Sequence, residues 1–290
     1  MQFFIRLVYL PLFLLVGNGI AIFLVQNGYP KFSLVGLVVS FIAIAFLIER
    51  WVPYDAAFNE SRGDRNRDFL HVLVNESLSV AGVMSIPLLA HLSPLPATWP
   101  TELPLWLQLL LAVFIADIGI TLAHFASHRL DSLWRLHAVH HSVKRMYGLN
   151  GLMKHPLHQS IETVAGTTPL LLMGAPVEVM MLLVVAVALQ LLLQHSNVAY
   201  FTGPLKYLLA INVVHRFHHI GNGEEGDVNF GLFTSLTDRF LGTAFFEKNR
   251  IIGSDDIGIE DYPDYPVDYL AQLIEPFRSA LPETQSLPGE

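Results

Sequence analysis

Three short runs of histidine are the residues in this sequence that are best suited to chemistry. Each run contains histidines three or four residues apart, and the last two runs end in an adjacent pair: His124 and His128, then His137, His140 and His141, then His215, His218 and His219. Side chains at this spacing on a helix share one face, so each run can direct two or three imidazoles toward a single point. Such spacing is typical of metal ligands.

The eight histidines of these runs are more than one metal ion needs. A tetrahedral zinc site takes at most four protein ligands, so two metal ions are the economical interpretation. Imidazole binds zinc, copper, iron and nickel, and two neighbouring ions can act together in oxygen or hydrolytic chemistry. The alternative is that these histidines are only polar residues on helices next to a membrane, which suits a lone histidine better than three spaced runs.

Composition indicates an integral membrane protein. Hydrophobic residues make up 52% of the chain and charged residues only 14%, with a mean hydropathy of +0.46, whereas a soluble domain carries roughly 25% charged residues. The chain has no cysteine, which excludes thiolate ligands and disulfides. The formal net charge is -8, and no basic run suggests a nucleic-acid partner.

The apolar segments predict an all-α fold. A helix needs about 20 residues to cross a bilayer, and five apolar segments are candidates: Phe3–Val25, Leu34–Ile48, Leu78–Leu92, Leu105–Leu122 and Gly166–Leu193. The first is too long for a signal peptide and predicts a retained anchor. The last is interrupted at Gly174-Ala175-Pro176, where proline disfavours a continuous helix. We therefore expect about four transmembrane helices plus a re-entrant or kinked helical hairpin.

Basic residues next to these segments predict the orientation of the protein. Four arginines follow the second segment: Arg50, Arg62, Arg65 and Arg67. The loop between the first two segments carries only Lys31, so the arginine-rich loop should be cytoplasmic. Four crossings then place residues 124–162 and the chain from His195 onward on the cytoplasmic side as well. All three histidine runs share one face, and we expect a cytoplasmic helical cap that holds the metals.

Acidic residues near the runs are candidates for supporting the site. Asp117 lies two helical turns before His124 in an apolar stretch, where a carboxylate is costly unless it is paired. Metal-bound imidazoles usually donate their second N–H to a carboxylate or a carbonyl. We therefore predict Asp117 and Asp238 as site carboxylates. Helix capping or a solvated surface position is the alternative for these and for three further candidates: Asp131, Glu162 and Asp227.

Sequence motifs around the histidines resemble a known family. His124–Arg129 and Leu133–Ser142 resemble the first two histidine boxes of the fatty acid hydroxylase and sterol desaturase superfamily, and His215–His219 resembles the third. Asn229–Gly231 and Thr237–Thr243 resemble the motif that closes its catalytic domain.

The resemblance implies a membrane-bound non-haem di-iron oxygenase. Such an enzyme uses O2 and two electrons to hydroxylate or desaturate a lipid C–H bond, so its cofactor would be two iron ions, for which zinc could substitute. Sterols, fatty acyl chains and related lipids are all open as the lipid substrate. The choice between hydroxylation and desaturation is open too.

The resemblance also extends the set of predicted metal ligands. His195 precedes the third box in a motif similar to that of the family, and His155 lies in a segment similar to the one that follows the second box. We therefore predict both as metal ligands in addition to the histidines of the three runs. His158 stands where the family pattern requires no histidine.

The resemblance divides the chain into three parts. Residues 1–113 would form N-terminal transmembrane helices and a basic cytoplasmic loop, residues 114–246 the catalytic domain, and residues 247–290 an acidic tail. No cytochrome b5-like, flavin or nicotinamide motif is visible, so electrons must come from a separate electron-transfer protein. The tail could be the docking surface for that protein, although an acidic tail is more often only solvated.

Two other functions use the same histidines. A divalent-metal transporter would need ligands near the bilayer midplane and a polar path across the membrane. Here the histidines cluster at the ends of the apolar segments, which are nearly free of charge apart from Asp117 and Glu178. A zinc-dependent membrane hydrolase would reuse the same ligands, but the extended motif match favours the oxygenase.

Overall fold

The computed structural model describes residues 1–92 and 96–278, and within these residues the protein is helical with no β-strand. Five helices are long and apolar enough to cross a membrane: Gln2–Gln26, α3 (Phe32–Trp51), Arg65–Ile86 of α4 (Arg65–Leu92), α5 (Leu105–Ser127) and α8 (Val177–His195). The first consists of α1 (Gln2–Pro11), a π-helical segment (Leu12–Gly17) and α2 (Asn18–Gln26). The predicted all-α fold is confirmed.

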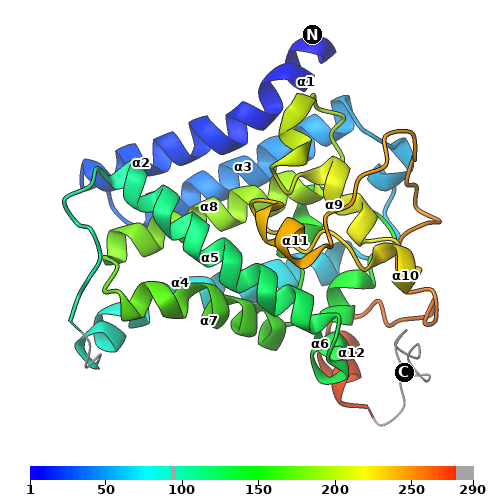
Figure 1. Ribbon diagram of the computed structural model, residues 1–290. Helices are drawn as coiled ribbons and strands as arrows, with labels where there is room; N and C mark the ends of the chain where they lie inside the picture. The colour runs from blue at the N-terminus through cyan, green and yellow to red at the C-terminus, as the bar shows by residue number, and fades with distance from the viewer. Residues whose placement is uncertain (93–95, 279–290) are drawn as a thin grey trace.

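Helix α8 forms the centre of the bundle. It is the most buried of the five candidate spans, and in Figure 1 it lies between α2 and α3 on one side and α4 and α7 (Pro156–Leu172) on the other. The chain turns between α7 and α8 at Gly174, whose φ of +76° suits glycine, and Pro176 precedes the first residue of α8. The predicted break at Gly174-Ala175-Pro176 is therefore a hairpin between two helices, and α8 is itself a candidate span.

Helix α4 begins earlier than its apolar stretch predicts. We expected a span from Leu78, but the helix starts at Arg65. Its first turns carry polar side chains that are buried inside the protein, among them His71 and Asn75, while Phe69 faces outward. The apolar stretch alone places the start of this helix too late, because the polar residues of its first turns are buried inside the bundle instead of being exposed to water.

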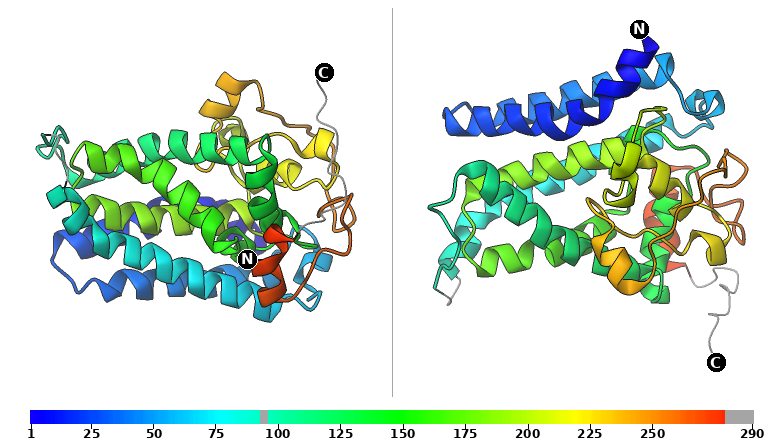
Figure 2. Two further views of the ribbon diagram at one scale, coloured as in Figure 1. Left: turned by 90° about the horizontal axis from the view of Figure 1, so that it is seen from below. Right: turned by 45° about the horizontal axis from the view of Figure 1, so that its top comes forward.

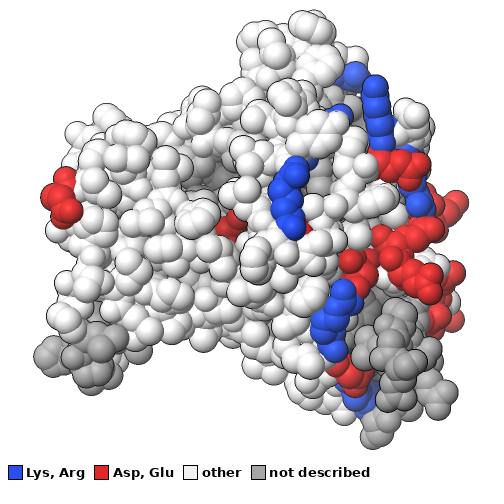
Figure 3. All heavy atoms as spheres, viewed as in Figure 1, with Lys and Arg blue, Asp and Glu red and all other residues white. Residues whose placement is uncertain are grey.

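The short helices gather at one end of the bundle. Figures 1 and 2 show them together, away from the opposite ends of the long helices: α6 (Asp131–His141), α9 (Asn212–His218), α10 (Gly223–Gly226), α11 (Leu236–Leu241) and α12 (Tyr269–Ile274). Four 3-10 turns are also present in the part of the chain that the structure describes: Ala56–Asn59, Gly148–Leu152, Gly203–Tyr207 and Glu275–Phe277. In Figure 3 most of the charged residues on the viewed face also lie over this end. We call this end the cap.

Buried carboxylates at the cap tie its loops to the long helices. Glu49, in the last turn of α3, accepts hydrogen bonds from the backbone N–H groups of Gly148 at 2.7 Å and Asn197 at 3.0 Å. Asp68 on α4 accepts a hydrogen bond from the hydroxyl of Tyr147 at 2.6 Å. Backbone donors that leave water need such acceptors. These contacts fix the segments that precede Met153 and follow His195.

Helices α5 and α7 pack closely through two glycines. A Cβ atom at Gly119 would lie 2.2 Å from the backbone oxygen of Ala165, and one at Gly166 would lie 2.7 Å from a side-chain carbon of Ile120. Small residues allow this approach, which is a common way for helices to associate in membranes. Because α5 carries His124, the glycine contact also sets where that imidazole lies.

Substitution of Gly119 by alanine should loosen this contact. The new methyl group meets backbone, which has little freedom to move away, so we expect Gly119→Ala to destabilise the protein by about 1–3 kcal/mol. Gly36→Ala is the matched control, since a Cβ at Gly36 has no atom within 4 Å. Thermal unfolding in detergent would measure both. Equal melting temperatures for the two variants would contradict the close α5–α7 packing.

Candidate metal centre

Nine imidazoles meet in two groups inside the cap. One contains His124, His128, His137, His141 and His218, and the other contains His140, His195, His215 and His219. Within each group the candidate ligand atoms all lie within 4.8 Å of one another. We call them the five-histidine group and the four-histidine group. The structure thus brings together nine of the ten predicted ligands, and their role as ligands stays a prediction.

Both H-x2-H-H runs are shared between the two groups. On α6, His137 and His141 join the five-histidine group while His140 joins the other. In the third run the assignment is reversed. The middle histidine, His218, joins the five-histidine group, whereas His215 and His219 join the four-histidine group. Successive residues on a helix point about 100° apart, so adjacent histidines cannot serve one ion. Each of these two runs therefore sends two imidazoles to one group, as its spacing predicts, and the third imidazole to the other group.

The distances within the groups suit metal coordination. In the five-histidine group, Nε2 of His137 lies 3.0 Å from Nε2 of His124 and 3.0 Å from Nε2 of His141. Nε2 of His141 lies another 3.0 Å from Nε2 of His218. In the four-histidine group, Nε2 of His195 is 3.1 to 3.2 Å from the Nε2 atoms of its three partners. Nitrogen ligands about 2.0–2.1 Å from one ion are separated by about such distances.

The second ring nitrogens show that these contacts are not ordinary hydrogen bonds. Nδ1 of His140 lies 2.9 Å from the carbonyl oxygen of Met153, and Nδ1 of His195 lies 3.1 Å from that of Leu191. A carbonyl oxygen only accepts, so both Nδ1 atoms carry the proton. In neutral imidazoles this leaves a lone pair on each Nε2. The two lone pairs face each other at 3.2 Å, a repulsive contact that a cation bound between them would make favourable.

A proton is a poor candidate for that cation. Removal from water lowers the pKa of His218 to about 3, and burial together with the neighbouring imidazoles holds the pKa of His140 well below its usual range. The rings outside the long helices are therefore neutral near pH 7, which is the form that binds metals. The donor set fits two metal ions.

Backbone carbonyls from one loop hold the five-histidine group. Nδ1 of His124 bonds to the carbonyl of Phe230 at 2.8 Å, and Nδ1 of His218 to that of Val228 at 2.9 Å. Asn229 between them adopts a φ of +56°, and its side chain is bonded to the backbone of Phe245. The loop therefore has a fixed shape that orients two imidazoles.

The two predicted site carboxylates fix this loop and do not contact an imidazole. Asp238 accepts hydrogen bonds from the N–H groups of Phe230 and Gly231, both at 2.8 Å. Asp117 on α5 accepts from the N–H of Phe233 at 2.8 Å and from Thr234. Both act on the site through the loop backbone. Sequence spacing placed the two carboxylates near the histidines. It could not show that their oxygens would accept hydrogen bonds from backbone N–H groups of the loop.

His155 lies outside both groups. It precedes α7, where its Nδ1 accepts a hydrogen bond from the N–H of Leu157 at 3.2 Å, and its Nε2 lies 3.3 Å from the carbonyl oxygen of Leu273. A helix start leaves N–H groups without partners, and this ring supplies an acceptor.

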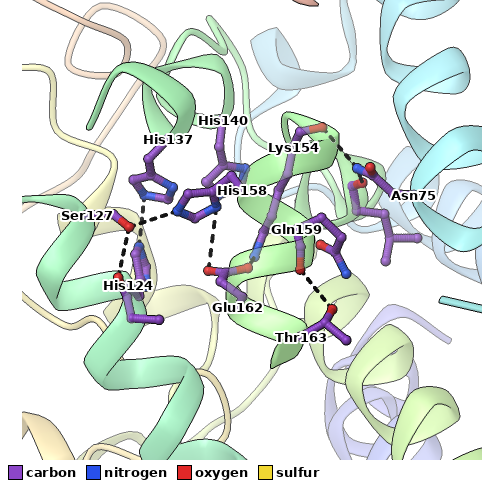
Figure 4. A network of polar contacts seen from close by, with 12 residues as sticks. Asn75, His124, Ser127, His137, His140, Lys154, His158, Gln159, Glu162 and Thr163 are labelled. Atoms are coloured by element: carbon purple, nitrogen blue, oxygen red, sulfur yellow. Dashed lines mark hydrogen bonds and ion pairs between the residues drawn. The ribbon is translucent and has the colours of Figure 1, made fainter. Parts of the chain in front are cut away.

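His158 packs beside the five-histidine group without joining it. Its ring centroid is 4.4 Å from that of His137, and its Nε2 lies 2.9 Å from the hydroxyl oxygen of Ser127. Figure 4 shows His158 between Ser127 and Glu162. Of the other predicted carboxylates, Asp227 pairs with Arg129 and lies 3.7 Å from Nδ1 of His128.

Several polar residues that support the site were not predicted. Gln190 and Gln194, one turn apart on α8, donate hydrogen bonds to backbone carbonyls at Leu232 and Gly231. Lys154 pairs with Glu162 inside the protein. The sequence did contain a signal for the two glutamines. Two amide side chains one turn apart in an apolar helix are costly to bury unless they have hydrogen-bond partners.

Comparisons with known proteins match the part of the chain that contains both histidine groups. A family model for fatty acid hydroxylase matches residues 109–243. Ornithine lipid hydroxylase OlsE of Rhizobium tropici is 34% identical over 247 residues, which cover 82% of this chain and 73% of that protein. Alkylglycerol monooxygenase of Danio rerio is 29% identical over 165 residues, which cover 56% of this chain but only 34% of that relative. No solved structure matches the chain. The family model and the extent of the first similarity show that this protein belongs to the fatty acid hydroxylase family.

Proposed function

We propose that this protein is a membrane-bound di-iron oxygenase that hydroxylates a lipid C–H bond, with O2 and two electrons from a separate electron-transfer protein. The observation that carries the proposal is the convergence of nine imidazoles in two groups at one end of a membrane-type bundle, eight of them buried and that of His128 partly buried. The named activities of the two relatives, a lipid hydroxylase and a monooxygenase, support hydroxylation over desaturation.

Iron suits the donor set better than zinc does. A five-histidine group offers more ligands than a tetrahedral zinc site uses, and imidazole is a good ligand for iron. A zinc-dependent hydrolase therefore ranks second, with zinc as a substitute metal in the same groups. A metal transporter fits less well because His124 and His195 lie in the last turns of α5 and α8, not at the middle of a span.

The residues of the chain have separable tasks in this proposal. Bound iron would supply the reaction of O2 with the lipid C–H bond. The imidazoles hold the ions, while the carbonyls of Phe230, Val228 and Met153 keep the protons on Nδ1 and leave Nε2 free. Leu191 and Leu232 line the cavity between the groups and limit its access to water.

The position of the site suits a substrate that stays in the bilayer. Both groups lie where long apolar helices end, and the charged residues gather over the same end in Figure 3. A lipid could therefore present a carbon to the metals without leaving the membrane. We also propose that the cap faces the cytoplasm, because α4 begins at Arg65, directly after Asp64, whose carboxylate pairs with Arg145.

Metal analysis of detergent-purified protein tests the proposal. We expect about two irons per chain after anaerobic loading with ferrous iron, and a loss of iron in His137→Ala and His218→Ala, since each variant removes a ligand from the five-histidine group. His155→Ala is the matched control and should keep its iron, because that ring lies outside both groups.

The outcomes of this measurement separate the candidate functions. Protein that binds no transition metal would contradict the proposal. Two zincs that iron cannot replace would favour the hydrolase. If the iron content is as expected, lipid extracts of expressing cells should contain a lipid with one added oxygen atom, which should be absent with the His137→Ala variant.

Asp238 should act on the metal centre through the loop that it holds. Asp238→Asn replaces one acceptor oxygen by an amide donor, so it releases the N–H of Phe230 or Gly231. We expect iron affinity to fall about 10- to 100-fold, as is usual when support for a metal-binding histidine is lost. Competition with a chelator would measure this. Asp261→Asn, at an exposed position, is the control, and equal affinities in the two variants would refute the role of Asp238.

A further inference from the structure

A lysine lies on the wall of the cavity between the two histidine groups. The cavity has a volume of about 10 Å³ and is lined by imidazoles of both groups, among them His124, His140 and His195, which leaves room for about one water-sized molecule. Lys154 and Glu162 also line it. Lys154 is only 6% exposed and Glu162 only 4%.

The lysine is fixed at both ends. The carbonyl of Met153, the preceding residue, accepts the hydrogen bond from His140, and the carbonyl of Lys154 itself accepts one from Asn75 at 3.0 Å. At the other end the ammonium group pairs with Glu162 on α7, as Figure 4 shows. This arrangement holds a cation beside the metal ligands.

A cation at this place needs an explanation. Neither histidine group contains a carboxylate, and neutral imidazoles do not cancel the charge of two divalent ions. The ammonium group of Lys154 adds to this excess of positive charge. The carboxylate of Glu162 offsets only the charge of the lysine. Buried positive charge is costly without a partner anion. Among the described residues, Glu162 is the one recorded acceptor for the three N–H donors of the ammonium group.

We propose that Lys154 is an anion-binding residue of the metal centre, whose ammonium group holds a small monovalent anion in the cavity beside the four-histidine group. The proposal rests on the proposed metal-dependent function. The size of the cavity selects a single-atom or hydroxide-sized anion over a carboxylate. Glu162 then competes with the anion for the ammonium group.

Fluoride binding to the Co2+-loaded protein in detergent tests this proposal, because cobalt makes anion binding visible by absorption. We expect wild-type protein to bind fluoride and Lys154→Met to bind it at least about tenfold more weakly, through the loss of a charge-assisted hydrogen bond. Lys154→Arg should recover part of the affinity. Lys248→Met, at an exposed position, should bind fluoride as wild type does.

The Glu162→Gln variant separates anion binding from a purely structural ion pair. It removes the competing negative charge, so we expect fluoride to bind at least as tightly as in wild type, opposite to the effect of Lys154→Met. Equal weakening in both variants at unchanged cobalt content would overturn the proposal, as would wild-type affinity in Lys154→Met or no fluoride binding at all. A wild-type protein that holds no metal would instead refute the proposed function, and the inference with it.

Discussion

The meeting of imidazole lone pairs inside the cap is the constraint on which the rest of the structure depends. His140 and His195 turn their Nε2 atoms toward each other, while the Nδ1 atom of each faces a backbone carbonyl oxygen, which favours a proton on Nδ1. Such contacts are repulsive without a cation, and burial disfavours protonation. The fold must therefore hold these rings in place against their own repulsion, which requires rigid supports around each of them.

Those supports come from buried carboxylates on the long helices α3 and α5 and on the short helix α11. Glu49 fixes the backbone at Gly148 and at Asn197. Asp117 and Asp238 fix the loop that contacts His124. Each carboxylate accepts two or more hydrogen bonds from the backbone, which offsets its own cost of burial. The same rule explains why the site lies at the end of the bundle, where α5 and α8 finish and irregular backbone is available.

The histidine pattern predicted most of the site but not its internal arrangement. Spacing and family resemblance selected nine residues that the structure brings together, and hydropathy identified the long helices. Helix geometry explains why His140 and His141 belong to different groups. It also requires partner histidines on both sides of α6, and a sequence does not show where those partners lie. The roles of Glu49 and Lys154 depend on contacts between residues far apart in the chain. His155 was included by motif alone, and the structure places it at a helix start.

X-ray absorption at the iron edge of loaded protein is the most direct test of the central claim, that imidazoles alone supply the protein ligands of both ions. The account predicts iron surrounded by nitrogen at about 2.0–2.2 Å, with the outer-shell scattering of several imidazole rings per iron. A spectrum dominated by oxygen ligands with little imidazole scattering would contradict it, because the metals would then lie outside the two histidine groups.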